Sequence, residues 1–207
     1  MGLKAQLEGT LQAVTDFDSP DRGLEQYRTP ASVAAHLIAL ADLQGDIEDR
    51  TIVDLGSGTG MLAIGAALRS PGRVIGIEVD AAAISRARQS ESSLFEDRRI
   101  DWVRGDATRV PVHLDGATVV ANPPFGAHRD NRHADRDFLE TIAADAAVSY
   151  TIHNEASREF LEAFTMDNGG RITHAYGVEF HVPKQFRHHE SASHAIQAEL
   201  YRVAWDR

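Results

Sequence analysis

The stretch TIVDLGSGTGMLAIGAALR, residues 51–69, decides the fold that we expect for this chain. Its first five residues are mostly β-branched or apolar and predict a buried strand. The glycines of DLGSGTG, residues 54–60, allow a tight turn, and the apolar run from residue 61 onward predicts a helix. A strand that passes through a glycine-rich turn into a helix is the opening unit of an α/β fold with a parallel sheet.

The same alternation continues to the end of the chain. Further strands and helices are predicted in turn: strands at 73–79, 100–105, 117–122 and 148–153, helices at 81–95, 134–146 and 157–166, then long strands at 171–183 and 195–206. The last two strands have no helix between them, which predicts an antiparallel end to the sheet. We therefore expect a doubly wound α/β fold, with a seven-stranded, mostly parallel sheet, helices on both faces and an antiparallel last strand.

Two helices are predicted before residue 51. Residues 1–15 carry leucines at helical spacing, and a second helix is expected at 29–43 with Thr29 as N-cap and Pro30 at its first position. We assign residues 1–45 as an N-terminal helical extension of a single domain, residues 1–207.

Composition narrows the class of protein. The chain has 207 residues, of which 43% are hydrophobic and 25% charged, as suits one globular domain with a sizeable core. It has neither an apolar run that could cross a membrane nor the apolar core of a signal peptide, so we expect a cytoplasmic protein. The absence of cysteine excludes thiolate metal sites, and the ten histidines show no ligand pattern. The formal charge of −10 argues against nucleic-acid binding over the whole surface but not against a local basic patch.

A ligand site is expected where the first three strands end, because open α/β sheets bind ligands outside the carboxyl ends of their strands. Glu78 ends the second strand at about the place where such folds put an acid for ribose hydroxyls. Asp80 is an alternative for this role, or the N-cap of the next helix. Asp106 follows the third strand and suits an acceptor for an adenine amine, with Ala107 supplying backbone. The glycine spacing at 56–60 departs from the dinucleotide pattern G-x-G-x-x-G, which disfavours a nicotinamide enzyme.

The stretch VVANPPFG, residues 119–126, ends the fourth strand in a rigid turn. Pro123 and Pro124 fix φ and cannot donate to a sheet ladder. The Asn122 side-chain oxygen and the Pro123 carbonyl would then be two fixed acceptors for the N–H groups of a planar amine, whose lone pair they localise as it attacks. Phe125 offers a face on which a flipped base can stack. The alternative is a proline-terminated strand whose asparagine only caps the turn.

Together, DLGSGTG, the acids at the strand ends and NPPF resemble class I S-adenosylmethionine-dependent methyltransferases over roughly residues 25–205. NPPF itself resembles the N-P-P-[FYW] motif of amino-methyltransferases. The order of LEQYRTP, NPPFG, VSYTIHNEASREF and KQFRHH resembles the methyltransferase-like protein 5 family. That resemblance implies methylation of adenosine N6 in small-subunit ribosomal RNA. Guanine N2 in RNA and a protein glutamine amide stay open as alternatives, since each presents a planar NH₂; Phe125 in place of tyrosine favours a nucleobase.

The resemblance also implies roles for individual residues. Gly56, Thr59 and Met61 line the methionine end of S-adenosylmethionine, and Gln26 and Thr29 close over it. The predicted cofactor-binding residues are Gln26, Thr29, Asp54, Gly56, Gly58, Thr59, Met61, Glu78, Asp106, Ala107 and Asn122. The predicted catalytic residues are Asn122, Pro123, Pro124 and Phe125, and no metal is expected.

Two partners are expected, RNA and a small zinc-binding activator subunit, the second implied by the resemblance alone. Lys184 and Arg187 would contact RNA phosphates, although this turn carries fewer fixed charges than is usual in the family. The strand at 100–105 is expected at a sheet edge. Its apolar residues, Trp102 among them, either pair with the partner or pack under the flanking helices, and the sequence leaves both open.

Overall fold

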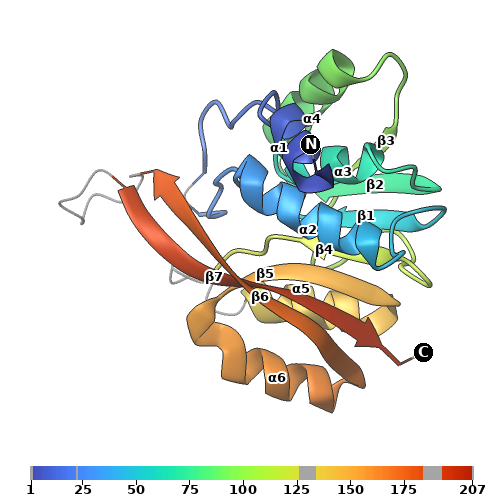
Figure 1. The fold of residues 1–207 in the computed structure, drawn as a ribbon, viewed down its shortest axis with the longest axis vertical. Helices are drawn as coiled ribbons and strands as arrows, with labels where there is room; N and C mark the ends of the chain where they lie inside the picture. Colours follow the sequence, from blue (N-terminus) through green and yellow to red (C-terminus); the bar gives the residue numbers. More distant parts are fainter. Residues whose placement is uncertain (1, 22, 126–133, 184–192, 207) are drawn as a thin grey trace.

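A computed structural model describes residues 2–21, 23–125, 134–183 and 193–206 (Figure 1). In chain order its main elements are α1 (Leu3–Leu11), α2 (Ala31–Leu43), β1 (Thr51–Leu55), α3 (Met61–Ala67), β2 (Arg73–Glu78), α4 (Ala81–Leu94), β3 (Ile100–Arg104), β4 (Thr118–Ala121), α5 (Ala134–Asp145), β5 (Val148–Asn154), α6 (Arg158–Asp167), β6 (Gly170–Pro183) and β7 (Ser193–Trp205). A short 3₁₀ turn, Glu155–Ser157, leads into α6. Each helix and strand predicted from the pattern is present, and the bounds differ by a few residues.

The strands form one seven-stranded sheet in the order β3-β2-β1-β4-β5-β7-β6. Neighbouring strands from β3 to β5 are parallel, whereas β7 runs antiparallel to both β5 and β6. The predicted mostly parallel sheet with an antiparallel last strand is therefore confirmed. Because the order reverses between β1 and β4, the carboxyl ends of these two strands flank the place where such folds bind ligands.

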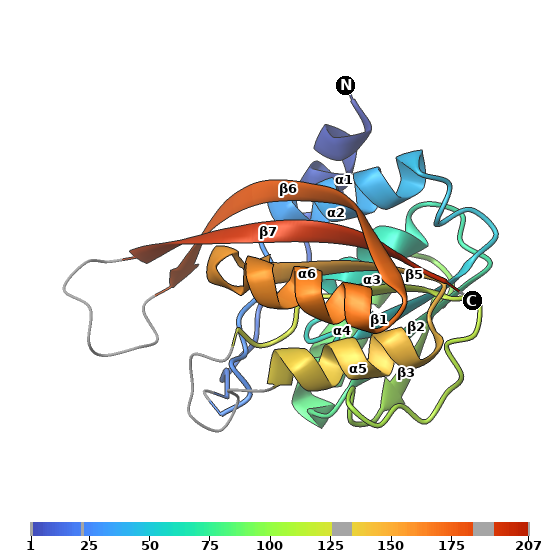
Figure 2. The same ribbon diagram turned by 90° about the horizontal axis from the view of Figure 1, so that it is seen from below.

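The helices cover both faces of the sheet (Figures 1 and 2). Helices α1 to α4 pack on one face, where their buried side chains join those of the sheet in one apolar core. Helices α5 and α6 pack on the opposite face in a second core. Along β1, β2 and β4, apolar side chains point to both cores, as parallel strands covered by helices on both faces require.

The N-terminal helices are present as predicted, but the assignment of Thr29 as an N-cap is wrong. Helix α2 begins at Ala31, the cap position is Pro30 with φ −58° and ψ 141°, and no side chain caps the helix. The hydroxyl of Thr29 instead accepts a hydrogen bond from Asn122 Nδ2 over 3.0 Å. The Thr29 side chain, which would cap the helix in a local interaction, is therefore bonded to Asn122, a distant residue just after β4.

Strand β3 lies at the sheet edge as predicted, and its largest side chain belongs to the core. Trp102 is buried, and its Nε1 donates to Oε2 of Glu91 in α4 over 2.7 Å. The indole lies across Gly60 and Gly76, where an added Cβ would stand 2.7 Å and 2.4 Å from ring atoms. Of the two possibilities left open by the sequence, Trp102 therefore packs under the helices and presents no surface to a partner.

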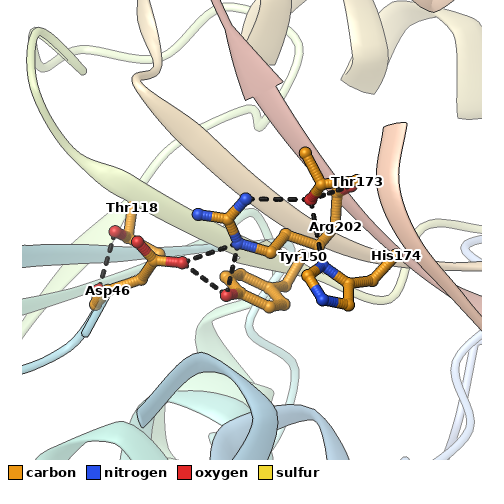
Figure 3. Close-up of polar contacts among 6 residues, drawn as sticks. All are labelled: Asp46, Thr118, Tyr150, Thr173, His174 and Arg202. Carbon is orange, nitrogen blue, oxygen red and sulfur yellow. Dashed lines mark hydrogen bonds and ion pairs between the residues drawn. The ribbon is translucent and has the colours of Figure 1, made fainter. Parts of the chain in front are cut away.

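A polar network connects β6 and β7 to β5 and to the segment before β1 (Figure 3). Arg202 of β7 donates from Nε to Asp46 Oδ2 over 2.8 Å and to the Tyr150 hydroxyl over 2.9 Å, and from a terminal nitrogen to Thr173 Oγ1. Thr118, the first residue of β4, donates to the carbonyl oxygen of Asp46 over 2.7 Å. Since Asp46 precedes β1 and Thr118 begins β4, the network lies at the amino ends of these strands, away from the predicted site.

Candidate active site

The carboxyl ends of β1, β2 and β4 open into a cavity of about 330 Å³, which the segment between α1 and α2 helps to enclose. Every residue predicted to bind the cofactor lines this cavity, and so does Pro124. Pro123 and Phe125 lie in the adjoining turn and are not among the lining residues. The structure thus brings together predicted residues from five separate parts of the sequence at the switch point of the sheet.

The glycine-rich turn takes its shape from left-handed backbone at its three glycines. Gly56, Gly58 and Gly60 have φ of 68°, 53° and 89°, a region that other residues rarely adopt. The amides of Gly56 and Ser57 both donate to the carbonyl oxygen of Ile77 in β2, each over 2.9 Å. The turn is therefore hydrogen-bonded to the neighbouring strand and presents its backbone to the cavity.

Glu78 is buried at the end of β2, where two backbone amides hold its carboxylate. Oε2 accepts from Gly58 over 2.8 Å, and Oε1 accepts from Asp80 over 2.9 Å. Each oxygen has a second lone pair, so the carboxylate retains acceptor capacity toward the cavity. Its position matches the acid predicted for ribose hydroxyls.

Asp80 takes the other role that the sequence allowed. Its Oδ1 accepts from the amide of Ala82 in the first turn of α4, over 2.8 Å, which makes it the N-cap. Its Oδ2 accepts from Gln26 Nε2 over 2.9 Å, and these bonds, that to Gln26 foremost, lower its pKa. Asp80 is not among the residues that line the cavity, and it ties the segment before α2 to the sheet.

Asp54 is a buried carboxyl at the end of β1. Its Oδ2 accepts from the amide of Ala63 over 2.8 Å. Burial raises its pKa from 3.8 to about 7, the Ala63 bond acts in the opposite direction, and the nearby Glu78 raises the pKa further. Two acids beside one cavity favour a ligand that carries positive charge.

Asp106 shapes the turn after β3. Its Oδ1 accepts from both the amide and the hydroxyl of Thr108, each over 2.8 Å. The side chain is exposed, whereas Ala107 beside it is buried, and both line the cavity. The third strand thus brings an acceptor and a stretch of backbone to the position predicted from the sequence.

Asn122 follows β4 directly and is held at both ends of its amide. Nδ2 donates to Thr29 Oγ1 over 3.0 Å, and Oδ1 accepts from the Tyr27 hydroxyl over 3.4 Å. In the same turn Pro123 is buried, and Phe125 packs against the core formed with α1 to α4. The turn is anchored on both sides, so the amide oxygen and the aromatic ring have fixed positions.

Three aromatic residues of the site were not predicted. Tyr27, Phe17 and Phe138 all line the cavity. The ring of Phe138, from α5, lies 3.1 Å from the point where a Cβ on Gly56 would stand, and Phe17 lies 3.0 Å from that point on Gly58. Tyr27 stands between two predicted residues in LEQYRTP, so its position was a signal, whereas Phe17 and Phe138 carry no local pattern that points to a site.

Comparison with known proteins places the chain in a family. The family model of the methyltransferase small domain matches residues 34–149, more than half of the chain. The rRNA N(6)-adenosine-methyltransferase METTL5 of Danio rerio is 30% identical over 98% of this chain and 98% of its own length. Its counterpart in Drosophila melanogaster is 31% identical over 95% and 94%.

The chain belongs to the METTL5 family of methyltransferases. A crystal structure of a candidate RNA methyltransferase from Pyrococcus horikoshii agrees with it at a TM-score of 0.90 and 33% identity, and the match covers 100% of both chains. The methyltransferase class and the S-adenosylmethionine dependence predicted from the sequence are confirmed by this membership. The fold class of the METTL5 family is also the one predicted.

Some predictions concern parts of the chain without a described structure. Lys184, Arg187, His188 and His189 lie outside the described residues. Within the described ranges no three His, Asp or Glu side chains form a group that could hold a metal ion. The helices in those ranges include none that is long and apolar enough to cross a membrane.

Proposed function

We propose that the protein methylates N6 of an adenosine in small-subunit ribosomal RNA, with S-adenosylmethionine as the methyl donor. The observation that carries this proposal is the position of Asn122, whose amide borders the same cavity as the acids at the ends of β1 and β2. The names of the full-length METTL5 relatives support adenosine N6 over the alternative acceptors, guanine N2 and a protein glutamine amide.

The cavity fits the cofactor in charge and in acceptors. S-adenosylmethionine supplies a methyl group activated by a positively charged sulfur. Asp54 and Glu78 favour a cation there, and Glu78 has lone pairs left for the ribose hydroxyls. We assign adenine recognition to Asp106 and Ala107. The methionine end is assigned to the residues of the glycine turn and of the segment before α2, namely Gly56, Gly58, Thr59, Met61, Gln26 and Thr29.

The Asn-Pro-Pro-Phe turn would prepare the amine for attack. Asn122 Oδ1 and the Pro123 carbonyl accept the two N–H groups of adenine N6, and the amine lone pair is then localised toward the methyl group. Pro123 and Pro124 keep these acceptors in place, so the turn does not reorganise during the reaction. The N6 proton leaves after methyl transfer, so the turn does not have to supply a strong base. Phe125 stacks on the flipped base.

The β6–β7 hairpin offers a place for RNA. The last β5–β7 pair joins Asn154 to Ala198, whereas β6 and β7 remain paired as far as Pro183 and Ser193. The hairpin therefore projects past the carboxyl end of β5 (Figure 2). Strand β4 is parallel to β5, so its carboxyl end, which Asn122 follows, lies at this same end of the sheet. We propose that RNA runs from this hairpin to the cavity, with Lys184 and Arg187 contacting phosphates.

We further propose that the chain acts as one domain in the cytoplasm together with a small zinc-binding activator subunit. Strand β3 is the sheet edge opposite the hairpin, and an edge strand has backbone groups available for pairing. Because Trp102 is in the core, such a partner would pair with the backbone of β3.

Single-turnover methyl transfer tests the proposed function. Wild-type protein at saturating S-adenosylmethionine should methylate an RNA that carries the target adenosine, and should not methylate the same RNA with inosine at that position, which has no amine. Asn122→Ala should lower the rate by on the order of 10²–10³-fold with cofactor affinity nearly intact, and Asn122→Asp should be milder because a carboxylate still accepts. Equal methylation of inosine RNA, or a wild-type rate in Asn122→Ala, would overturn the mechanism.

A further inference from the structure

In the proposed reaction Asn122 and Phe125 receive the target base. Tyr27 contacts both of these residues. Its hydroxyl donates to Asn122 Oδ1 over 3.4 Å. Its ring centroid lies 5.8 Å from that of Phe125, with the two planes tilted by 46°. Asn122 and Phe125 belong to one turn after β4, whereas Tyr27 comes from the segment before α2. One side chain therefore joins the acceptor oxygen to the stacking ring.

The Asn122 amide needs such a partner. A carboxamide has nearly the same shape after a half-turn about its last bond, which exchanges the acceptor oxygen for a donor NH₂. In this structure Thr29 accepts from Nδ2, and Tyr27 donates to Oδ1. At 3.4 Å this bond is longer than the usual O–H···O range, so it is weak, but it favours the orientation that turns the oxygen toward Tyr27. The oxygen has a second lone pair for the amine.

The Tyr27 hydroxyl acts as a donor. Burial raises its pKa above the ordinary value for tyrosine, the bond to Asn122 acts in the opposite direction, and Glu25 raises the pKa further. The hydroxyl is therefore protonated throughout the neutral range. It can hold an acceptor oxygen in place but cannot take a proton from the substrate.

The Tyr27 ring acts on Phe125 by packing. Aromatic rings at this separation and tilt are in direct contact. Both rings also pack against the core formed with α1 to α4. Tyr27 therefore restricts the orientation of the Phe125 ring on which the base is proposed to stack.

We propose that Tyr27 is a positioning residue that holds both base-receiving groups of the turn, Asn122 through its hydroxyl and Phe125 through its ring. This inference rests on the proposed function. It implies that the segment before α2, besides enclosing the cofactor cavity, sets the geometry of the base site.

Two substitutions separate the two contacts. Tyr27→Phe keeps the ring and removes the hydroxyl, so kcat should fall about threefold to tenfold, the effect of one hydrogen bond, while KM for RNA stays unchanged. Tyr27→Leu also removes the ring and should raise KM for RNA as well. The matched control is Tyr150→Phe, because the Tyr150 hydroxyl donates to Asp46 at the amino end of the sheet and Tyr150 does not line the cavity. Tyr150→Phe should leave both constants unchanged.

A double-mutant cycle distinguishes positioning of Asn122 from a general effect on the fold. In an Asn122→Ala background, Tyr27→Phe should have no further effect on kcat, because the group it positions is gone. Thermal unfolding of Tyr27→Phe should match wild type. Equal loss of kcat from Tyr27→Phe in both backgrounds, or no loss in wild type, would overturn the proposal.

A measurement without RNA keeps this test independent of the proposed function. The side-chain amide signals of Asn122 in a ¹⁵N–¹H correlation spectrum can be identified by their loss in Asn122→Ala. They should move in Tyr27→Phe and stay in place in Tyr150→Phe. Unmoved signals in Tyr27→Phe would refute the positioning role. Failure of the wild-type protein to methylate adenosine RNA, with the signals moving as expected, would refute only the proposed function.

Discussion

The backbone amide of Gly58 donates to Glu78 Oε2 over 2.8 Å and so joins the glycine turn after β1 to the end of β2. The bond fixes the carboxylate from one side, and the amide of Asp80 fixes it from the other. An acceptor held in this way is oriented before a ligand arrives, so a ligand hydroxyl does not have to order it.

Glu78 is the first residue to test in cofactor binding. Glu78→Ala removes the predicted ribose acceptor together with the partner of Gly58. The affinity for S-adenosylmethionine should fall by roughly 1.5–3 kcal/mol, the range for a hydrogen bond to a charged group. Glu78→Gln keeps one acceptor oxygen and should lose less. Calorimetry measures the affinity of both variants. An unchanged affinity for S-adenosylmethionine in Glu78→Ala would contradict the assignment of Glu78 to the cofactor site, and tight binding of NAD would contradict the cofactor assignment.

Cofactor affinity should depend on pH through Asp54. The pKa of this carboxyl is raised to about 7 in the free protein, so the group is partly protonated at neutral pH. A cationic ligand favours the ionised form, and its affinity should therefore rise by about tenfold from pH 6 to pH 8. Calorimetry across this range should show proton release on binding, and Asp54→Asn should flatten the dependence.

The stability of the free protein gives an independent check on Asp54. Its folded-state pKa lies above the ordinary value of 3.8, so the folded state holds this proton more firmly than the unfolded chain. The stabilisation from this group is then complete below about pH 4 and is lost as the pH rises through about 7. Chemical denaturation of wild type and Asp54→Asn should diverge over that window. Parallel curves would mean that Asp54 ionises normally.

Trp102 should contribute to stability and not to partner binding. Trp102→Ala removes a buried indole and leaves Glu91 without its Nε1 donor, at an expected cost of about 3–5 kcal/mol in the free energy of unfolding. Trp102→Phe should cost less. Val103→Lys in the same strand should be tested beside it for partner binding, because Val103 is only partly buried. Loss of an activator subunit in pull-downs with a fully folded Trp102→Phe would contradict the core assignment.

Arg202 should stabilise the fold without affecting catalysis. Arg202→Met leaves the carboxylate of Asp46 without its guanidinium partner, and breaking a mostly buried ion pair costs about 3 kcal/mol. The double variant with Asp46→Asn should lose less than the sum, since both changes remove one interaction. Denaturation measures the cost. The methyl-transfer rate of folded Arg202→Met should equal that of wild type, because the network lies at the opposite end of β4 from Asn122.

The sequence by itself was enough to predict the succession of strands and helices, the mostly parallel sheet and the polar residues at the strand ends that line the cavity. Period-two and helical patterns are local, and a parallel sheet brings the carboxyl ends of its strands to one edge. Residues at or just beyond the carboxyl ends of β1, β2, β3 and β4 must then meet, which is why Asp54, Glu78, Asp106 and Asn122 could be named together. The glycine turn and the Pro-Pro turn are likewise set by local backbone chemistry.

The tertiary structure alone decided how these residues are held. Thr29 has the local pattern of a helix cap, yet its hydroxyl pairs with an asparagine 93 residues away. Asp46 and Arg202 are 156 residues apart and meet only because β7 is inserted between β5 and β6. Trp102 is in the core because Gly60 and Gly76 leave room for its ring. Such pairings depend on where distant segments cross in space, and no local pattern records that, because sequence periodicity reports only which face of an element a residue occupies.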